Sequence, residues 1–246
     1  MDIKTYLKKQ AITFASAHGC NSNSVSEYVL AAILQIANKN NIILEGKSIA
    51  IIGVGNVGKK ISVKAKALGL NVLLNDPPRA RDEGNIFFTS LNECLNADII
   101  TVHTPLTFEG QYKTLNLISF ENMNKIREDA ILINAARGAI INEEAWLNKK
   151  VKGSIIDCWA NEPDIDIDLM IKADISTPHI AGHAYDGKVN GTKMIRKAFC
   201  DFLKIKNRFA FEQFIPKLDS HIIEFDSKGK NDQEIINDIV SHVYPT

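Results

Sequence analysis

The amino-acid sequence predicts an α/β fold in which a doubly wound parallel sheet is covered by helices on both faces. Short apolar runs alternate with longer amphipathic segments through the middle of the chain. The runs are continuously apolar, which is typical of parallel strands buried on both faces. A glycine-rich turn, Gly-Val-Gly-Asn-Val-Gly, follows the first run. Since strands that alternate with helices form parallel sheets with right-handed crossovers, we expect one open sheet.

Six apolar segments are the expected strands. They span residues 48–53, 71–76, 98–103, 130–135, 153–158 and 174–179. Expected helices span residues 56–68, 143–150 (capped by Asn142), 187–205 and 231–244. Ser24 with Glu27, and Ser90 with Glu93, have the spacing of capping boxes at helix starts. Residues 211–226 are expected to supply one or two further strands.

The composition excludes several classes of protein. The 246 residues include 29 Lys+Arg and 29 Asp+Glu, so no net charge draws the chain to nucleic acid or to an anionic membrane. Apolar runs such as 49–52 are far shorter than the ~20 residues that a membrane span requires. The four cysteines form no CxxC pair, so we expect reduced thiols, no metal site and a cytoplasmic protein.

The glycine-rich turn predicts a dinucleotide site and a Rossmann-type sheet. Gly53 permits the tight turn, Gly55 lets a pyrophosphate approach the backbone, and Gly58 lets the helix pack close to the strand. The free N–H groups at the start of that helix favour an anion. Asp76 ends the next strand, where its carboxylate suits the ribose hydroxyls of NAD and repels the 2′-phosphate of NADP. Nearby Arg79 and Arg81 leave the choice of cofactor open.

Three polar residues follow later strands and are candidates for catalysis: Arg137, Glu162 and His179. The carboxyl ends of parallel strands form the ligand crevice, where a nicotinamide would arrive. A histidine suits the proton transfer of alcohol oxidation, a glutamate orients its ring, and an arginine binds a carboxylate. A lone histidine is more often structural, and the joint placement favours catalysis. Thr104 is expected at the cofactor and His103 in a turn, with Trp146 and Trp159 as packing residues.

The ordered motifs resemble those of the D-isomer-specific 2-hydroxyacid dehydrogenases. They are GVGNVG, Asp76, HTPL at 103–106, NAARG at 134–138, DxWxxEP at 157–163 and HIAG at 179–182. The segments NDPPRA and HTPLTFEGQYKTLNL are similar to one branch of that family. The resemblance implies an NAD-dependent oxidoreductase that acts on a small phosphorylated hydroxy acid in vitamin B6 biosynthesis, as a cytoplasmic homodimer that binds neither nucleic acid nor membrane.

The resemblance also assigns site residues by matching motif positions. Arg137, Glu162 and His179 are the implied catalytic residues, and Arg137 and His183 the implied substrate contacts. His183 stands where the family usually has tyrosine. The implied NAD contacts, including the glycine turn, are Gly53, Gly55, Asn56, Val57, Gly58, Asp76, Thr104, Ala135, Ala136, Asp157 and Gly182.

The same resemblance implies a division of the chain into parts. We expect residues 1–20 to be a remnant of a substrate domain and 21–186 to be the NAD-binding domain. Residues 187–206 would return as a helix to the substrate domain, and 207–246 would form part of a C-terminal dimerisation domain. With both ends truncated, this chain alone is expected to bind NAD and to be nearly inactive. Two alternatives stay open: another D-2-hydroxyacid dehydrogenase, such as one acting on phosphoglycerate, and a non-catalytic NAD-binding fragment.

Overall fold

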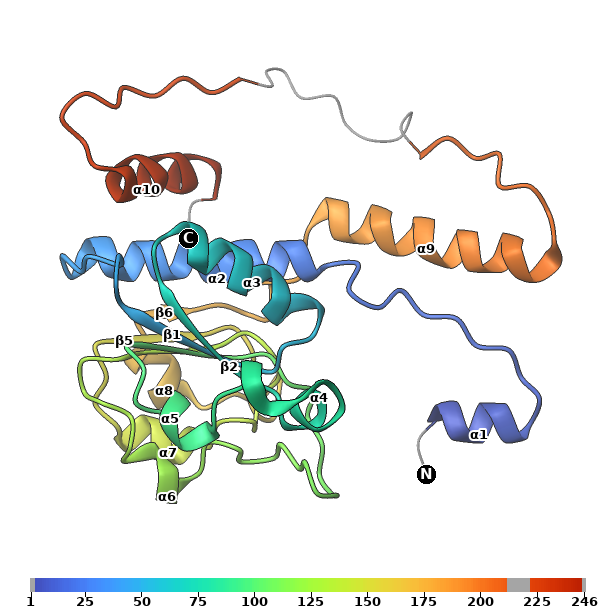
Figure 1. Cartoon of the computed structure of the whole chain (residues 1–246), viewed down its shortest axis with the longest axis horizontal. Coiled ribbons are helices and arrows are strands. Elements are labelled where there is room, and N and C mark those ends of the chain that lie inside the picture. The colour runs from blue at the N-terminus through green and yellow to red at the C-terminus, as the bar shows by residue number, and fades with distance from the viewer. Residues whose placement is uncertain (1–2, 212–221, 245–246) are drawn as a thin grey trace.

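A six-stranded parallel sheet forms the centre of the molecule (Figure 1). The computed structural model describes residues 3–211 and 222–244. The sheet order is β2-β1-β3-β4-β5-β6, and every neighbouring pair is parallel. The strands are β1 Ser48–Ile52, β2 Asn71–Asn75, β3 Ile99–Val102, β4 Ile131–Asn134, β5 Gly153–Ile156 and β6 Ile175–Ser176. The predicted doubly wound sheet is therefore confirmed. β6 is shorter than expected, because the extended backbone ends before His179, whose φ is +56°.

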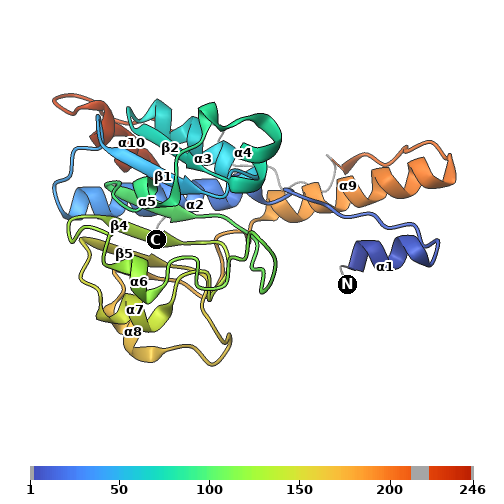
Figure 2. The same cartoon turned by 60° about the horizontal axis from the view of Figure 1, so that its bottom comes forward.

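Helices cover both faces of this sheet, as Figure 2 also shows. The helices of the described residues, among them α1 and α9, which extend away from the sheet, are α1 Ile3–Lys9, α2 Ser22–Lys39, α3 Asn56–Ala67, α4 Pro77–Glu83, α5 Leu91–Cys94, α6 Phe120–Met123, α7 Glu143–Asn148, α8 Ile167–Lys172, α9 Tyr185–Leu203 and α10 Asp232–Val243, with a short 3-10 helix at Asn85–Phe87. Successive strand residues point to opposite faces. Ile49 and Ile51 accordingly join one core with α2 and α3, whereas Ala50 and Ile52 join the other with α5 to α8.

Side-chain caps fix several helix starts. The Ser90–Glu93 capping box and the Asn142 cap are present as predicted. The capping box predicted at Ser24 and Glu27 is wrong, because α2 begins two residues earlier, at Ser22. The backbone already turns at Gly19, whose φ is +78°, and the Ser22 hydroxyl donates to the Gly19 carbonyl at 2.7 Å.

The C-terminal helix α10 packs on the main body. It matches the helix predicted over 231–244. Its Gln233 side chain accepts from Leu44 N–H and donates to the Ile42 carbonyl, each at 2.8 Å. The Tyr244 ring stands edge-on to Tyr28 of α2, with 6.4 Å between ring centroids. Of the strands predicted within 211–226, residues 212–221 lie outside the described residues, and residues 222–226 form no strand.

Helix α9 projects away from the sheet (Figures 1 and 2) and leaves Phe199, Phe202 and Leu203 exposed. It spans Tyr185–Leu203, close to the predicted 187–205. None of the described helices has the length and apolar character needed to cross a bilayer.

Candidate active site

The glycine turn joins β1 to α3 and leaves open space at the start of that helix. Gly53 has a φ of +94°, and a Cβ on Gly58 would lie 2.2 Å from the Gly53 carbonyl oxygen. A Cβ on Gly55, in contrast, would have no atom within 4 Å. Two glycines are therefore required by the fold, whereas Gly55 keeps clear a space in front of the helix N-terminus that suits a pyrophosphate.

Asp76 lies beside this turn, at the end of β2. One carboxylate oxygen accepts from Val54 N–H at 2.8 Å, and the other caps α4 by accepting from Arg79 N–H at 3.2 Å. The Arg79 guanidinium donates to the Val54 carbonyl at 2.6 Å and pairs with Glu83. Asp76 is half-buried and retains lone pairs for a ribose hydroxyl, and the charge of Arg79 is already compensated.

A cleft of about 280 Å³ opens between the glycine turn and the ends of β3 and β4. Its lining includes six of the predicted site residues: Asn56, Val57, Thr104, Ala135, Ala136 and Arg137. Within the described part of the chain, the buried Thr104 hydroxyl has no hydrogen-bond partner. An orphaned buried hydroxyl beside open space is what a polar ligand such as NAD would satisfy. These residues therefore fit NAD.

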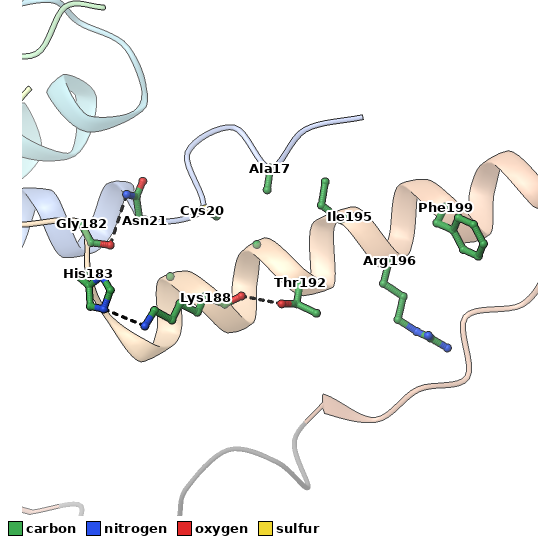
Figure 3. Close-up of a pocket in the computed structure, with 12 residues that line it drawn as sticks. Ala17, Cys20, Asn21, Gly182, His183, Lys188, Thr192, Ile195, Arg196 and Phe199 are labelled. Atoms are coloured by element: carbon green, nitrogen blue, oxygen red, sulfur yellow. Dashed lines mark hydrogen bonds between the residues drawn. The ribbon is translucent and has the colours of Figure 1, made fainter. Parts of the chain in front are cut away.

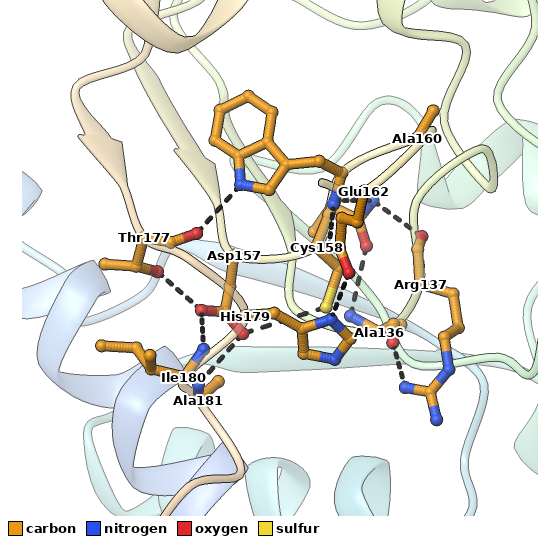
Figure 4. Close-up of polar contacts among 12 residues, drawn as sticks. Ala136, Arg137, Asp157, Cys158, Ala160, Glu162, Thr177, His179, Ile180 and Ala181 are labelled. Atoms are coloured by element: carbon orange, nitrogen blue, oxygen red, sulfur yellow. Dashed lines mark hydrogen bonds and ion pairs between the residues drawn. The ribbon is translucent and has the colours of Figure 1, made fainter. Parts of the chain in front are cut away.

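His179 and Glu162 face each other across the loops that follow β6 and β5 (Figure 4). His179 Nδ1 lies 2.9 Å from Glu162 Oε2. The other Glu162 oxygen accepts from Trp159 N–H at 2.8 Å, and the Trp159 indole donates to the Thr177 carbonyl at 2.9 Å. Burial raises the pKa of Glu162, but the bonds from Trp159 and His179 outweigh it and hold the pKa below its usual value. Glu162 is thus kept ionised.

Arg137 lies on the neighbouring loop after β4, and its charge contributes to lowering the pKa of Glu162. Its side chain is exposed and donates to the Ala136 carbonyl at 2.6 Å. The guanidinium can exchange that local bond for the carboxylate of a ligand in the cleft. The loops after β4, β5 and β6 therefore bring together the three predicted catalytic residues, as the strand order requires.

Asp157 lies inside the fold. It is 1% exposed. One oxygen accepts from Thr177 Oγ1 at 2.6 Å and Ile180 N–H at 2.7 Å, and the other from Ala181 N–H at 3.0 Å (Figure 4). The carboxylate thus holds the Thr177 side chain before His179 and two backbone N–H groups after it, and a direct NAD contact through it stays a prediction.

Gly182 and His183 lie at a second, larger cavity of about 870 Å³ against α9 (Figure 3). Lys188 Nζ donates to His183 Nε2 at 2.9 Å, and Arg196 lines the same cavity. Asn21 lines both this cavity and the cleft beside the glycine turn, and its side chain donates to the Gly182 carbonyl at 3.5 Å. The two spaces are therefore adjacent, with a basic wall on the α9 side.

Two residues have roles that the sequence pattern did not predict. Burial lowers the pKa of His103 to about 3, and its Nε2 lies 2.8 Å from Thr101 Oγ1, so this residue is a neutral part of the cleft wall. Trp159 packs in the core as expected but also ties Glu162 to the end of β6. The position of Trp159 inside the DxWxxEP motif is the sequence feature that could have indicated this role.

Comparison with known proteins agrees with this geometry. Residues 27–181 match the family model described as D-isomer specific 2-hydroxyacid dehydrogenase, NAD binding domain. The chain belongs to this family. The predicted Rossmann-type fold and the NAD cofactor are thereby confirmed, whereas the roles of single residues stay predictions.

Relatives within this 2-hydroxyacid dehydrogenase family share much of the sequence. Erythronate-4-phosphate dehydrogenase of Hydrogenovibrio crunogenus is 50% identical over 239 residues, and that of Proteus mirabilis is 39% identical over 244 residues. Each alignment covers 97% of this chain, but the chain spans only 63% and 64% of the length of these relatives.

Solved structures show the same fold at lower identity. NAD-dependent formate dehydrogenase of Staphylococcus aureus in complex with NAD has a TM-score of 0.64 at 21% identity, covering 75% of this chain and 63% of that one. D-mandelate dehydrogenase of Rhodotorula graminis has a TM-score of 0.68 at 20% identity, covering 81% and 68%.

Proposed function

We propose that this chain carries the NAD site and the acid–base residues of an erythronate-4-phosphate dehydrogenase. Such an enzyme oxidises 4-phospho-D-erythronate to (R)-3-hydroxy-2-oxo-4-phosphooxybutanoate in the biosynthesis of pyridoxal 5′-phosphate. The observation that carries the proposal is the His179–Glu162 pair at 2.9 Å beside Arg137, at the carboxyl edge of a dinucleotide-binding sheet. The identity to relatives of that name supports the choice of substrate.

In the proposed reaction, His179 accepts the proton of the substrate hydroxyl. Its Nδ1 is engaged by Glu162, which leaves Nε2 as the base. The Glu162 carboxylate stabilises the imidazolium that forms. Arg137 binds the substrate carboxylate and polarises the developing carbonyl. The glycine turn, Asp76 and Thr104 would hold NAD, which would supply the acceptor for the hydride that leaves C2.

Basic residues of the second cavity are placed to bind the phosphate group of the substrate. Lys188 and His183 line the cavity that adjoins the cleft at Asn21, and Arg196 lies farther along α9. These basic groups suit a phosphate at the end of the substrate opposite Arg137. A cytoplasmic homodimer is part of the proposal. It is supported by the exposed apolar side chains of α9 and by the four free cysteines.

The test is NADH formation from 4-phospho-D-erythronate, with 3-phosphoglycerate and unphosphorylated erythronate as competing substrates. It is run on the chain itself and on a chimera that adds the unaligned portions of the Hydrogenovibrio crunogenus relative. In the active form, His179→Ala should lower kcat by about 10²- to 10⁴-fold without changing the affinity for NAD. Preference for phosphoglycerate, or near-normal turnover of His179→Ala, contradicts the proposal.

A further inference from the structure

A chain of buried oxygens links helix α2 to the loop that carries His179. Tyr28 Oη lies 2.7 Å from Thr177 Oγ1, which in turn lies 2.6 Å from Asp157 Oδ1. Tyr28 is 0% exposed and Asp157 is 1% exposed. Tyr28 does not line the cofactor cleft. Among the described residues, its hydroxyl reaches the site through its hydrogen bond to Thr177.

The hydrogen bonds of this oxygen chain all run in one direction, from Tyr28 through Thr177 to Asp157. Asp157 Oδ1 also accepts from Ile180 N–H, so the Thr177 hydroxyl donates to this oxygen and offers only lone pairs to Tyr28. Burial raises the pKa of Tyr28, and its phenol keeps the proton that it donates to Thr177. Bonds aligned head to tail polarise one another, which strengthens each of them.

The loop that carries His179, at the end of this oxygen chain, needs such support. His179 has a φ of +56°, a left-handed conformation that is unfavourable for residues other than glycine. Its N–H donates to the Asp157 carbonyl at 2.8 Å, and the next two N–H groups, of Ile180 and Ala181, donate to the Asp157 carboxylate. Asp157 therefore fixes the backbone at and just after the strained residue.

We propose that Tyr28 is a positioning residue for His179. Its hydroxyl keeps Thr177 turned toward Asp157, and Asp157 holds the backbone from which the His179 ring reaches Glu162. The role of His179 as the base rests on the proposed function. The mechanical link from Tyr28 to the loop does not, so the two can be tested separately.

Amide hydrogen exchange of the chain itself tests the link without any activity. In Tyr28→Phe, which removes only the hydroxyl, exchange at Ile180 and Ala181 should accelerate about fivefold to tenfold, as expected for the loss of one buried hydrogen bond. Exchange at Ile51 in the core of β1 should not change. Tyr244→Phe is the matched control, because this ring packs against Tyr28 but lies outside the oxygen chain.

Substitutions at Thr177 test whether this residue stands between Tyr28 and Asp157 in the oxygen chain. Thr177→Val should accelerate the same two amides, Thr177→Ser should restore slow exchange, and Tyr28→Phe should add nothing once Val is present. Unchanged exchange at Ile180 and Ala181 in Tyr28→Phe, or equal acceleration at Ile51, overturns the proposal.

A kinetic measurement on the active chimera adds the functional readout. Tyr28→Phe should lower kcat severalfold while leaving KM for NAD unchanged, and Tyr244→Phe should change neither. A rise in KM for NAD with normal kcat assigns Tyr28 to the cofactor site and overturns the positioning role. If the chimera does not turn over erythronate 4-phosphate, the proposed function fails. The amide hydrogen exchange result still decides whether Tyr28 supports the loop that carries His179.

Discussion

The Glu162 carboxylate lies 2.9 Å from Nδ1 of His179, and because Glu162 is kept ionised, that nitrogen must be the donor. The ring is therefore held in the tautomer whose Nε2 is free to accept a proton. In the proposed mechanism, Glu162 thus prepares His179 as the base without itself touching the substrate.

Replacing Glu162 by Gln should impair turnover. The amide keeps the size of the side chain but loses the charge that favours imidazolium, so kcat should fall by roughly 10²-fold or more. Steady-state kinetics of the active chimera measure this, with the affinity for NAD by calorimetry expected to stay unchanged. Glu144→Gln on the exposed face of α7 is the control. Normal kcat in Glu162→Gln excludes the orienting role.

Two glycines of the same turn should respond differently to alanine. Gly55→Ala should leave the melting temperature unchanged, since a Cβ there meets nothing within 4 Å, but should weaken NAD binding by about tenfold or more. Gly58→Ala should destabilise the fold by about 1–3 kcal/mol, because its Cβ would lie 2.2 Å from the Gly53 oxygen. Thermal melting and calorimetric titration with NAD separate the two effects. Unaltered NAD binding by Gly55→Ala places the pyrophosphate elsewhere.

Asp76 should select NAD over NADP. We expect at least about a tenfold preference for NAD, because a carboxylate at the ribose opposes a 2′-phosphate. Asp76→Asn retains an oxygen to cap α4 and should narrow the preference, whereas Asp82→Asn on the same helix should not. Titration with both dinucleotides gives the ratio. Equal affinity for the two dinucleotides in the unmodified protein contradicts the role of Asp76, and a preference for NADP assigns the selection to Arg79 or Arg81.

Asp98 should contribute to stability at neutral pH. Its carboxylate accepts from Ser48 N–H at 2.8 Å and Ser48 Oγ at 2.7 Å, and it pairs with Arg127 and Lys47. Burial raises the pKa of Asp98, but these bonds outweigh it and hold the pKa well below its usual range. Asp98→Asn should lower the free energy of unfolding by about 1–3 kcal/mol at pH 7.

The Asp98 carboxylate also makes the free energy of unfolding depend on pH. Because the pKa of Asp98 is lower in the folded state, its contribution is complete above the unfolded pKa, near 4, and is lost as the pH falls toward the folded value. Urea unfolding of Asp98→Asn and unmodified protein should therefore give curves that converge on acidification. A difference that grows toward acid pH contradicts the assigned sign.

The amino-acid sequence alone predicted the features that depend on a local pattern of residues. The six strands follow from continuous apolar runs, and the strand ends place Arg137, Glu162 and His179 at one edge. The start of α2 was misplaced because the turn at Gly19 precedes the Ser24–Glu27 spacing. Tyr28 and Thr177 are 149 residues apart, and their hydrogen bond depends on how α2 packs on the sheet. No local periodicity predicts such a contact.

The Gln233 side chain satisfies a backbone donor and a backbone acceptor of the segment between α2 and β1. Helix α10 is therefore bound to the body in the manner of a peptide ligand, and its covalent attachment raises its effective concentration there. A tryptic nick after the exposed Lys228 should leave both pieces co-eluting, until dilution below their mutual dissociation constant releases the helix and uncovers the ring of Tyr28.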